Sequence, residues 1–271
     1  MSSEKEYVLG THDEEVERLG LQHRVWRPRS LDAWRRAGFT AGQTILDVGC
    51  GPGYASLDLA EIVGADGRVL AIDRSRRFLD ALAAMQSQRG LKNITPFELD
   101  LDEPRFPDTL VDAAWTRWVF AFVKHPQKLL ARIVAQLNPG APFVIFEYFN
   151  YTSWGLAPRL PELEEFVAAV VKSWRADGGE PNIALELPRW LEDLHFEIKS
   201  LNPIVDVVPS TNYVWRWPSS FLDVGIRRLV DIGGLSSERG EAIRNAFAKR
   251  EREGHSLMIT PGVLEIIAVK K

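Results

Sequence analysis

Short apolar or β-branched runs alternate with longer stretches in which apolar residues recur at helical spacing. The short runs, which predict strands, are residues 44–48, 69–73, 94–100, 111–116 and 142–148. The longer stretches, which predict helices, are residues 55–63, 76–90 and 126–140. Strands that alternate with helices of this length form βαβ units, so they run parallel and are covered by helices on both faces. The first half of the chain therefore predicts a doubly wound α/β fold.

The regular alternation of predicted strands and helices ends after residue 148. Residues 160–195 and 212–252 are predicted to be mostly helical, while residues 196–208 and 262–270 have the apolar pattern of two further strands. We interpret these strands as the last pair of the same sheet and the helical stretches as insertions that form a lid. Apolar residues at helical spacing over 12–37 predict one or two helices ahead of the first strand.

The expected organisation is one α/β body with additions at both ends. Residues 1–40 would hold lead-in helices and residues 41–150 the ligand-binding core. Residues 151–271 would hold the final strands of the core together with helical substrate-cap insertions at about 155–195 and 209–256. A chain of 271 residues can bury a sizeable core without disulfides or structural metals.

The first predicted strand ends on an acid and opens into a glycine-rich turn, "TILDVGCGPG" (Thr44 to Gly53). Ligands of doubly wound sheets bind at the carboxyl ends of the strands, close to this first turn. Glycine has no Cβ, so the backbone here can adopt unusual dihedral angles and press against a flat ligand. A glycine-rich turn by itself is a weak signal, because several kinds of nucleotide site share it.

Asp47 narrows the choice of ligand. In a dinucleotide site the turn faces a pyrophosphate, which a carboxylate at this position would repel. The third glycine of the dinucleotide fingerprint would also fall on Tyr54. A carboxylate fits a ligand that is cationic and lacks phosphate, and S-adenosylmethionine, with its sulfonium and ammonium groups, is such a ligand. A dehydrogenase is therefore a distant alternative.

Two further acids follow the next two predicted strands. Asp73 ends the second strand, 20 residues beyond Gly53, where a carboxylate can accept hydrogen bonds from both ribose hydroxyls. Asp100 ends the third strand, where it can accept from an adenine amino group. The competing interpretation is that these acids are ordinary turn or helix-capping residues, but three acids at three successive strand ends argue against it.

Composition excludes some classes of partner. The net charge is −4, so the chain has no excess of positive charge to bind nucleic acid, and we interpret the basic run "RSRRF" (Arg74 to Phe78) as a solvated face. Cys50 is the single cysteine and cannot form an intramolecular disulfide, which favours a reducing, cytoplasmic location. No stretch has the pattern of a signal peptide or of a membrane span, so we expect no membrane partner.

Four segments resemble the class I S-adenosylmethionine-dependent methyltransferases. They are "LDVGCGPG" (Leu46–Gly53), "AID" (Ala71–Asp73), "DLDEPRFPD" (Asp100–Asp108) and "LNPGAPFVIFEY" (Leu137–Tyr148). The last two are similar to segments of the ubiquinone/menaquinone-type and small-molecule branches. The resemblance covers about residues 40–150 and the closing strand. It implies a Rossmann-like fold with a mostly parallel seven-stranded sheet, S-adenosyl-L-methionine as the cofactor and S-adenosyl-L-homocysteine as its product.

The resemblance also implies roles for single residues. The glycine loop would wrap the methionine end of the cofactor, and the acids after the second and third strands would bind ribose and adenine. The cofactor-binding residues implied in the core are Asp47, Gly49, Cys50, Gly51, Gly53, Asp73, Arg74, Asp100, Leu101 and Arg117. Tyr7, Arg18 and Gln22 match a lead-in helix that closes over the cofactor in natural-product methyltransferases, although an ordinary amphipathic helix would look the same.

Methyl transfer is a direct displacement at carbon, in which the protein mainly aligns and desolvates the nucleophile. A general base assists when the nucleophile is a hydroxyl or an ammonium group. Glu147, at the end of the fifth strand, and His125, at a predicted helix start, are the candidate catalytic residues. The family often has a histidine where this chain has Phe122, which removes one candidate base. No cluster of acids near the fourth strand predicts a metal, so we expect none.

Aromatic residues gather after the fifth strand and between the last two strands. Such clusters are usually core, yet nine tryptophans in one chain, several of them in the insertions, suggest an apolar or aromatic substrate under the lid. The candidate substrate contacts are Tyr148, Tyr151, Trp154, Trp215 and Trp217.

The sequence thus predicts an enzyme, an S-adenosylmethionine-dependent methyltransferase that modifies an N or O atom of a small apolar or aromatic molecule. Two alternatives stay open. One is a C-methyltransferase of the quinone type, and the other is a protein with this fold that binds the cofactor without turnover. The expected partner is a small-molecule methyl acceptor, and the pattern does not determine the oligomeric state.

Overall fold

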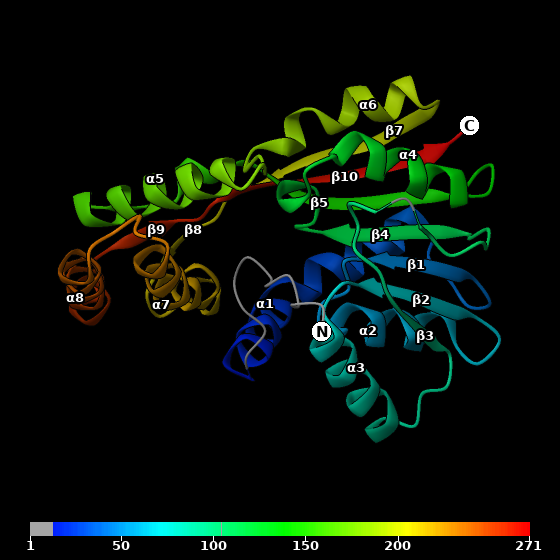
Figure 1. The fold of residues 1–271 in the computed structure, drawn as a ribbon, viewed down its shortest axis with the longest axis horizontal. Coiled ribbons are helices and arrows are strands. Elements are labelled where there is room, and N and C mark those ends of the chain that lie inside the picture. Colours follow the sequence, from blue (N-terminus) through cyan, green and yellow to red (C-terminus); the bar gives the residue numbers. More distant parts are fainter. Residues whose placement is uncertain (1–12, 104) are drawn as a thin grey trace.

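A seven-stranded sheet runs through the computed structural model, which describes residues 13–103 and 105–271 (Figure 1). The strand order is β3-β2-β1-β4-β5-β10-β7. The strands are β1 (Thr44–Val48), β2 (Arg68–Asp73), β3 (Ile94–Glu98), β4 (Ala113–Arg117), β5 (Pro142–Asn150), β7 (Phe196–Ile204) and β10 (Gly262–Lys270). Strands β1 to β5 pair in parallel, and β10 is antiparallel to both of its neighbours. The predicted fold class, a mostly parallel seven-stranded sheet, is confirmed.

Helices cover both faces of the sheet, because successive side chains of a buried strand point to opposite faces. On β1, Ile45 packs into the core that contains α1 (Asp13–Ala37), α2 (Tyr54–Val63) and α3 (Arg76–Gln88), whereas Leu46 and Val48 pack into the opposite core. That second core contains α4 (Pro126–Gln136) and α6 (Leu187–Asp193). The two groups of helices lie on opposite sides of the strands in Figure 1.

Local sequence explains where these helices begin and end. The Ser75 hydroxyl caps α3 by accepting a hydrogen bond from the Phe78 backbone N–H at 3.3 Å, and the chain leaves this helix through Gly90, at φ 67°. Pro126 is at the first turn of α4, where its missing N–H costs nothing. The lead-in segment forms one helix, α1, which contains Pro28.

Three helices form the cap beside the sheet: α5 (Pro161–Ala176), α7 (Arg216–Asp231) and α8 (Ser237–Glu253). They pack on one another, and α7 also packs on α1. Figure 1 shows the cap at the far end of the long strands β5 and β10. A small second sheet of β6 (Gly155–Ala157), β9 (Leu257–Ile259) and β8 (Val207–Pro209), which the sequence did not predict, joins cap and core.

The two expected cap insertions differ in where their helices lie. From residues 155–195, α5 lies in the cap, but α6 packs against β7 on the sheet. The domain boundaries drawn from sequence therefore stay a prediction. Within the described residues, no helix has the combination of length and apolarity that crossing a bilayer requires.

Candidate functional site

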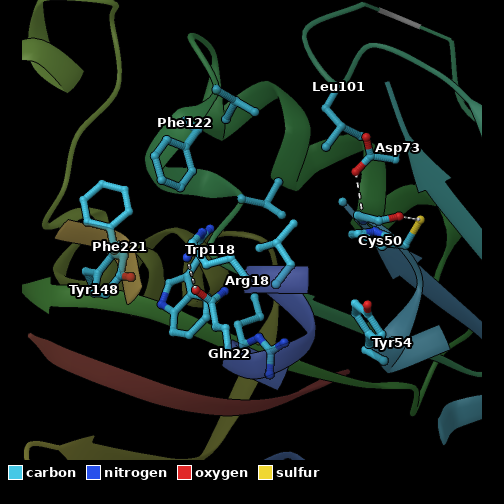
Figure 2. A pocket seen from close by; sticks show the side chains of 18 of the residues that line it. Arg18, Gln22, Cys50, Tyr54, Asp73, Leu101, Trp118, Phe122, Tyr148 and Phe221 are labelled. Carbon is cyan, nitrogen blue, oxygen red and sulfur yellow. Dashed lines mark hydrogen bonds between the residues drawn. The ribbon is translucent and has the colours of Figure 1, made fainter. Parts of the chain in front are cut away.

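A cavity lies between the carboxyl ends of β1, β2 and β4, helix α1 and the cap. It has two unlike ends (Figure 2). Asp73, Cys50 and Leu101 are on one side of the view, and Phe122, Phe221, Tyr148 and Trp118 are on the other, with Arg18 and Gln22 of α1 between them. Every one of these side chains lines the cavity.

The glycine loop after β1 fits tightly against its neighbours. Gly49 has a φ of 69°, and a Cβ there would come within 2.3 Å of a methyl group of Val119. Gly53 has a φ of 85°, is the N-cap residue directly before α2, and would place a Cβ 2.3 Å from a methyl group of Leu82. Any other residue type would be strained at both positions. Gly49 and Gly51 line the cavity, whereas Gly53 supports the loop from outside it.

Asp73 ends β2, and two backbone donors fix its carboxylate. Oδ2 accepts from the Gly51 N–H at 2.9 Å, and Oδ1 accepts from the Ser75 N–H at 2.8 Å. The side chain is only 6% exposed, and burial raises its pKa above the usual value. Each carboxylate oxygen retains a lone pair that can accept from a ligand in the cavity.

Asp100 lies two residues beyond β3, which ends at Glu98 rather than at the acid itself. It lines the cavity with Leu101 and Asp102, and its Oδ1 accepts from the Asp102 N–H at 3.0 Å. The Leu101 carbonyl accepts from Arg132, so this loop is held from behind.

Two opposite charges stand on the neighbouring strands β1 and β4. Asp47 is 1% exposed and accepts a hydrogen bond from the Ser56 hydroxyl at 2.5 Å, and burial raises its pKa to about 7. Arg117 ends β4, and burial lowers its pKa to about 10. Both line the cavity, and among the described residues no carboxylate lies within ion-pair distance of Arg117. A negative and a positive group side by side suit a zwitterionic ligand.

Helix α1 brings Arg18 and Gln22 to the middle of the cavity. Arg18 donates to both Glu15 oxygens, at 2.7 and 2.6 Å, and to the Gln22 Oε1 at 3.1 Å. Its guanidinium also lies over the ring of Phe221, 5.8 Å from the centroid. Tyr7, the third residue expected on this helix, is outside the described residues.

Three nearly parallel rings form the aromatic end of the cavity. Trp118 stacks on Tyr148 at a centroid distance of 5.4 Å and on Trp217 at 5.5 Å, with interplanar angles of 14° and 13°. Tyr148 and Trp217 are 2° from parallel. Further aromatic side chains that line the cavity are Phe122, Tyr151, Trp154, Trp174 and Phe221.

The two candidate bases are not in the cavity. Glu147 is completely buried, and its Oε1 accepts from the backbone N–H groups of Val119 and Phe120 at 2.5 and 2.7 Å. Burial raises its pKa to about 8. His125 is exposed at the start of α4, and its backbone N–H donates to Asp102. Neither side chain lines the cavity, so neither is placed to take a proton from a ligand there.

Trp215 is also outside the cavity. Its indole N–H donates to the Glu251 Oε1 at 2.6 Å, and its ring packs against Phe247. This tryptophan therefore fastens η4 (Tyr213–Trp215) to α8 within the cap. The other four expected substrate contacts, Tyr148, Tyr151, Trp154 and Trp217, all line the cavity.

Trp118 and Trp174 are cavity residues that the sequence did not single out. Trp118 has a φ of 55°, a strained conformation for a bulky residue, and residues of this kind concentrate at functional sites. Nothing in the sequence marks that strain, although Trp118 directly follows Arg117. Trp174 lies on the buried face of α5, where its spacing is that of any core residue. Among the described residues, no group of three or more possible metal ligands comes together.

Comparisons with known proteins agree with this geometry. Residues 45–140 match the family model described as a methyltransferase domain. A 2-phytyl-1,4-naphtoquinone methyltransferase of Nostoc punctiforme is 31% identical over 154 residues, which are 56% of this chain and 63% of that protein. A demethylmenaquinone methyltransferase of Symbiobacterium thermophilum is 28% identical over 150 residues, 53% of this chain and 59% of that protein. The chain thus matches less than two thirds of the length of these relatives.

Solved structures share the fold over nearly the whole chain. The (4+2)-cyclase SpnF has a TM-score of 0.58 at 20% identity, with 90% of this chain and 80% of that chain covered. A coclaurine N-methyltransferase bound to N-methylheliamine and S-adenosylhomocysteine has a TM-score of 0.53 at 16% identity, with 88% and 70% covered. At such identities a likeness establishes only the fold. Together, the matched domain, the related sequences and the glycine loop show that residues 45–140 form a methyltransferase domain similar to those of S-adenosylmethionine-dependent enzymes.

Proposed function

We propose that this protein transfers a methyl group from S-adenosylmethionine to an N or O atom of a small, flat aromatic molecule. The observation that carries the proposal is a single cavity with a polar end at the strand tips and an aromatic end under the cap. A donor at the first end and an acceptor at the second would share one enclosed space, which direct transfer requires.

The polar end suits the cofactor group by group. Asp73 can accept from the ribose hydroxyls, and Asp100 and Leu101 line the same end of the cavity, where an adenine that follows the ribose would lie. Asp47 and Arg117 offer opposite charges to the ammonium and carboxylate of the methionine part. When bound, S-adenosylmethionine supplies an electrophilic methyl group on a sulfonium centre.

The aromatic end suits a flat acceptor. The parallel faces of Trp118, Tyr148 and Trp217 provide a stacking surface, and the surrounding rings exclude water from the nucleophile. The carboxylates that line the cavity, Asp47, Asp73, Asp100 and Asp102, belong to the polar end. The described part of the chain therefore promotes transfer by alignment and desolvation rather than by a carboxylate or imidazole base.

A second candidate reaction is methylation of a ring carbon of a reduced quinone. The observation that favours it is the similarity to relatives named for phytylnaphthoquinone and demethylmenaquinone. A quinol ring is flat and would stack on the same three aromatic side chains, so the proposed site serves either reaction.

Incubation with deuteromethyl-labelled S-adenosylmethionine tests the proposal. The panel contains naphthols, aromatic amines and a reduced naphthoquinone, and mass spectrometry with NMR locates the label. Label on oxygen or nitrogen supports the first candidate, and label on a ring carbon supports the second. Tight binding of S-adenosylhomocysteine with no labelled product from any flat aromatic acceptor would favour a protein that binds the cofactor without turnover.

A further inference from the structure

A chain of polar contacts leads from Arg117 away from the cavity. The Arg117 Nη2 lies 3.5 Å from the Nδ1 of His23, and the His23 Nε2 lies 3.0 Å from the Asp58 Oδ2. Arg27 donates to the same Asp58 oxygen at 2.8 Å. The three side chains behind Arg117 therefore connect α1 and α2 to the end of β4.

These contacts determine which nitrogen of His23 carries the proton. A guanidinium has only donors, so Nδ1 of His23 must accept from Arg117. Nε2 then carries the hydrogen and donates to Asp58. The ring is neutral in this arrangement, and burial lowers its pKa, which keeps it neutral at pH 7. Its faces are fixed as well, because it stacks on Tyr54 with centroids 5.9 Å apart.

The hydrogen-bond partners of the Arg117 guanidinium fix its position but do not include a carboxylate. Its described contacts are His23, the Ser30 hydroxyl at 3.4 Å and the rings of Trp118 and Trp115, 5.1 and 6.0 Å from their centroids, and none of them is an anion. Arg117 is half-buried and makes no direct ion pair with a described residue; Asp47 and Asp58 act on its charge only at longer range, and such a cation is costly. That cost is relieved when a ligand in the cavity brings a carboxylate, which a guanidinium can bind through two parallel hydrogen bonds.

We propose that His23 is a positioning residue that aims the guanidinium of Arg117 at a carboxylate of the bound ligand. The identity of this ligand rests on the proposed function. The carboxylate belongs either to the methionine part of the cofactor or to an acidic aromatic acceptor. Asp58 serves His23 in turn, because it fixes the tautomer that leaves Nδ1 free to accept.

Calorimetric titration with two matched ligands tests the cofactor as the source. S-adenosylhomocysteine carries the carboxylate, and its decarboxylated analogue, S-adenosyl-3-thiopropylamine, differs only in lacking it. We expect the unaltered protein to prefer the first ligand by ~10-fold or more, the worth of one charge-assisted contact. Arg117→Met and His23→Phe should both lose that preference.

Two further variants, His23→Asn and His255→Gln, separate positioning from a structural role. His23→Phe itself keeps a ring that can stack on Tyr54, and melting temperatures verify that each variant is folded. In His23→Asn, the amide oxygen takes the place of Nδ1 as an acceptor, so the preference for the carboxylate ligand should return. His255→Gln, an exposed histidine far from the polar chain in sequence, is the control and should behave as the unaltered protein.

A second arm tests the acceptor as the source. With S-adenosylhomocysteine saturating, 1-hydroxy-2-naphthoic acid and its amide are titrated into the same variants. Loss of preference for the acid in His23→Phe, with recovery in His23→Asn, supports the proposal with the acceptor as the carboxylate donor. Unchanged preferences in both arms would overturn it. Failure of the unaltered protein to bind S-adenosylhomocysteine at all would instead overturn the proposed function.

Discussion

At the scale of single residues, burial raises the pKa of Asp47 so that ligand affinity should depend on pH near neutrality. The carboxyl group is 1% exposed, and its pKa is raised to about 7 chiefly by burial, against the hydrogen bond from Ser56. An ammonium group that binds beside Asp47 favours the ionised form. Binding below pH 7 must therefore release the proton of Asp47 first.

We therefore predict that the affinity for S-adenosylhomocysteine rises with pH and levels off above about 7. Below that value the dissociation constant should worsen by up to ~10-fold per pH unit, the limit for one linked proton. Titration calorimetry between pH 5.5 and 8.5 measures this slope. Asp47→Asn is the control, since it cannot ionise, and an equally steep slope in that variant would assign the proton to another group.

Glu147 is a buried acid that stabilises a backbone turn. It lies behind the turn that presents Trp118, and its Oε1 accepts two backbone N–H groups of that turn. Its pKa is raised from 4.5 to about 8 by burial, so between these values the folded protein holds a proton that the unfolded chain has released. The stability from this group is present below pH 4.5 and is lost as the pH rises through about 8.

Glu147→Gln should therefore gain stability relative to the unaltered protein as the pH rises from 5 to 8. The gain is limited to ~1.4 kcal/mol per pH unit, because one proton is involved. Urea unfolding at three pH values measures it, with methyl transfer as a second readout. Since Glu147 lies outside the cavity, we expect transfer to persist in the variant. A constant stability difference across this range would show that Glu147 is ionised in the folded protein.

At the scale of elements, two nearby tryptophans of the cap have different uses. Trp217 of α7 faces the cavity and stacks on Trp118, although it also contacts Trp26 of α1 at a centroid distance of 4.8 Å. Trp215 of η4 faces α8 and donates to Glu251. In the proposed function Trp217 belongs to the acceptor surface, whereas Trp215 belongs to the interior of the cap.

Trp217→Phe should weaken acceptor binding by ~10-fold, because a smaller ring stacks on less surface, and should leave cofactor affinity unchanged. Trp215→Phe is the matched variant. It loses a hydrogen bond to a charged partner, so it should cost roughly 1.5–3 kcal/mol of stability and leave acceptor affinity unchanged. Acceptor titrations and urea unfolding of both variants test the pair. Equal effects of the two changes on acceptor affinity would mean that the cap acts only as a scaffold.

At the scale of the whole molecule, the sheet could be predicted from sequence because its pattern is local. The run Thr44–Val48 is β1 residue for residue, and the glycine turn marks the ligand end of the sheet. The small sheet of β6, β8 and β9 could not be predicted, because its strands are three residues long and far apart in the chain. The packing of α6 on β7 is likewise a long-range contact.

In the candidate site, likewise, one end could be predicted from the sequence and the other could not. Its polar end follows from strand ends, which sequence marks with glycine and acids. Its aromatic end depends on which face of the sheet each side chain takes. A position at a strand end makes Glu147 a candidate base, but the alternation of side chains along the strand turns it away from the cavity. On β5, Phe146 and Tyr148 point toward the core of α1 and the cap, so Glu147 between them points to the other face. His23 could not be distinguished within α1, because its partners come from α2 and β4.

The cavity at the strand ends suits S-adenosylmethionine rather than a dinucleotide. Titration calorimetry of the purified protein with S-adenosylhomocysteine and with NAD tests it most directly. We expect saturable binding of S-adenosylhomocysteine that weakens by ~10-fold or more in Asp73→Ala, where hydrogen bonds to ribose are lost, and no binding of NAD. Saturable binding of NAD with no response to S-adenosylhomocysteine would contradict it.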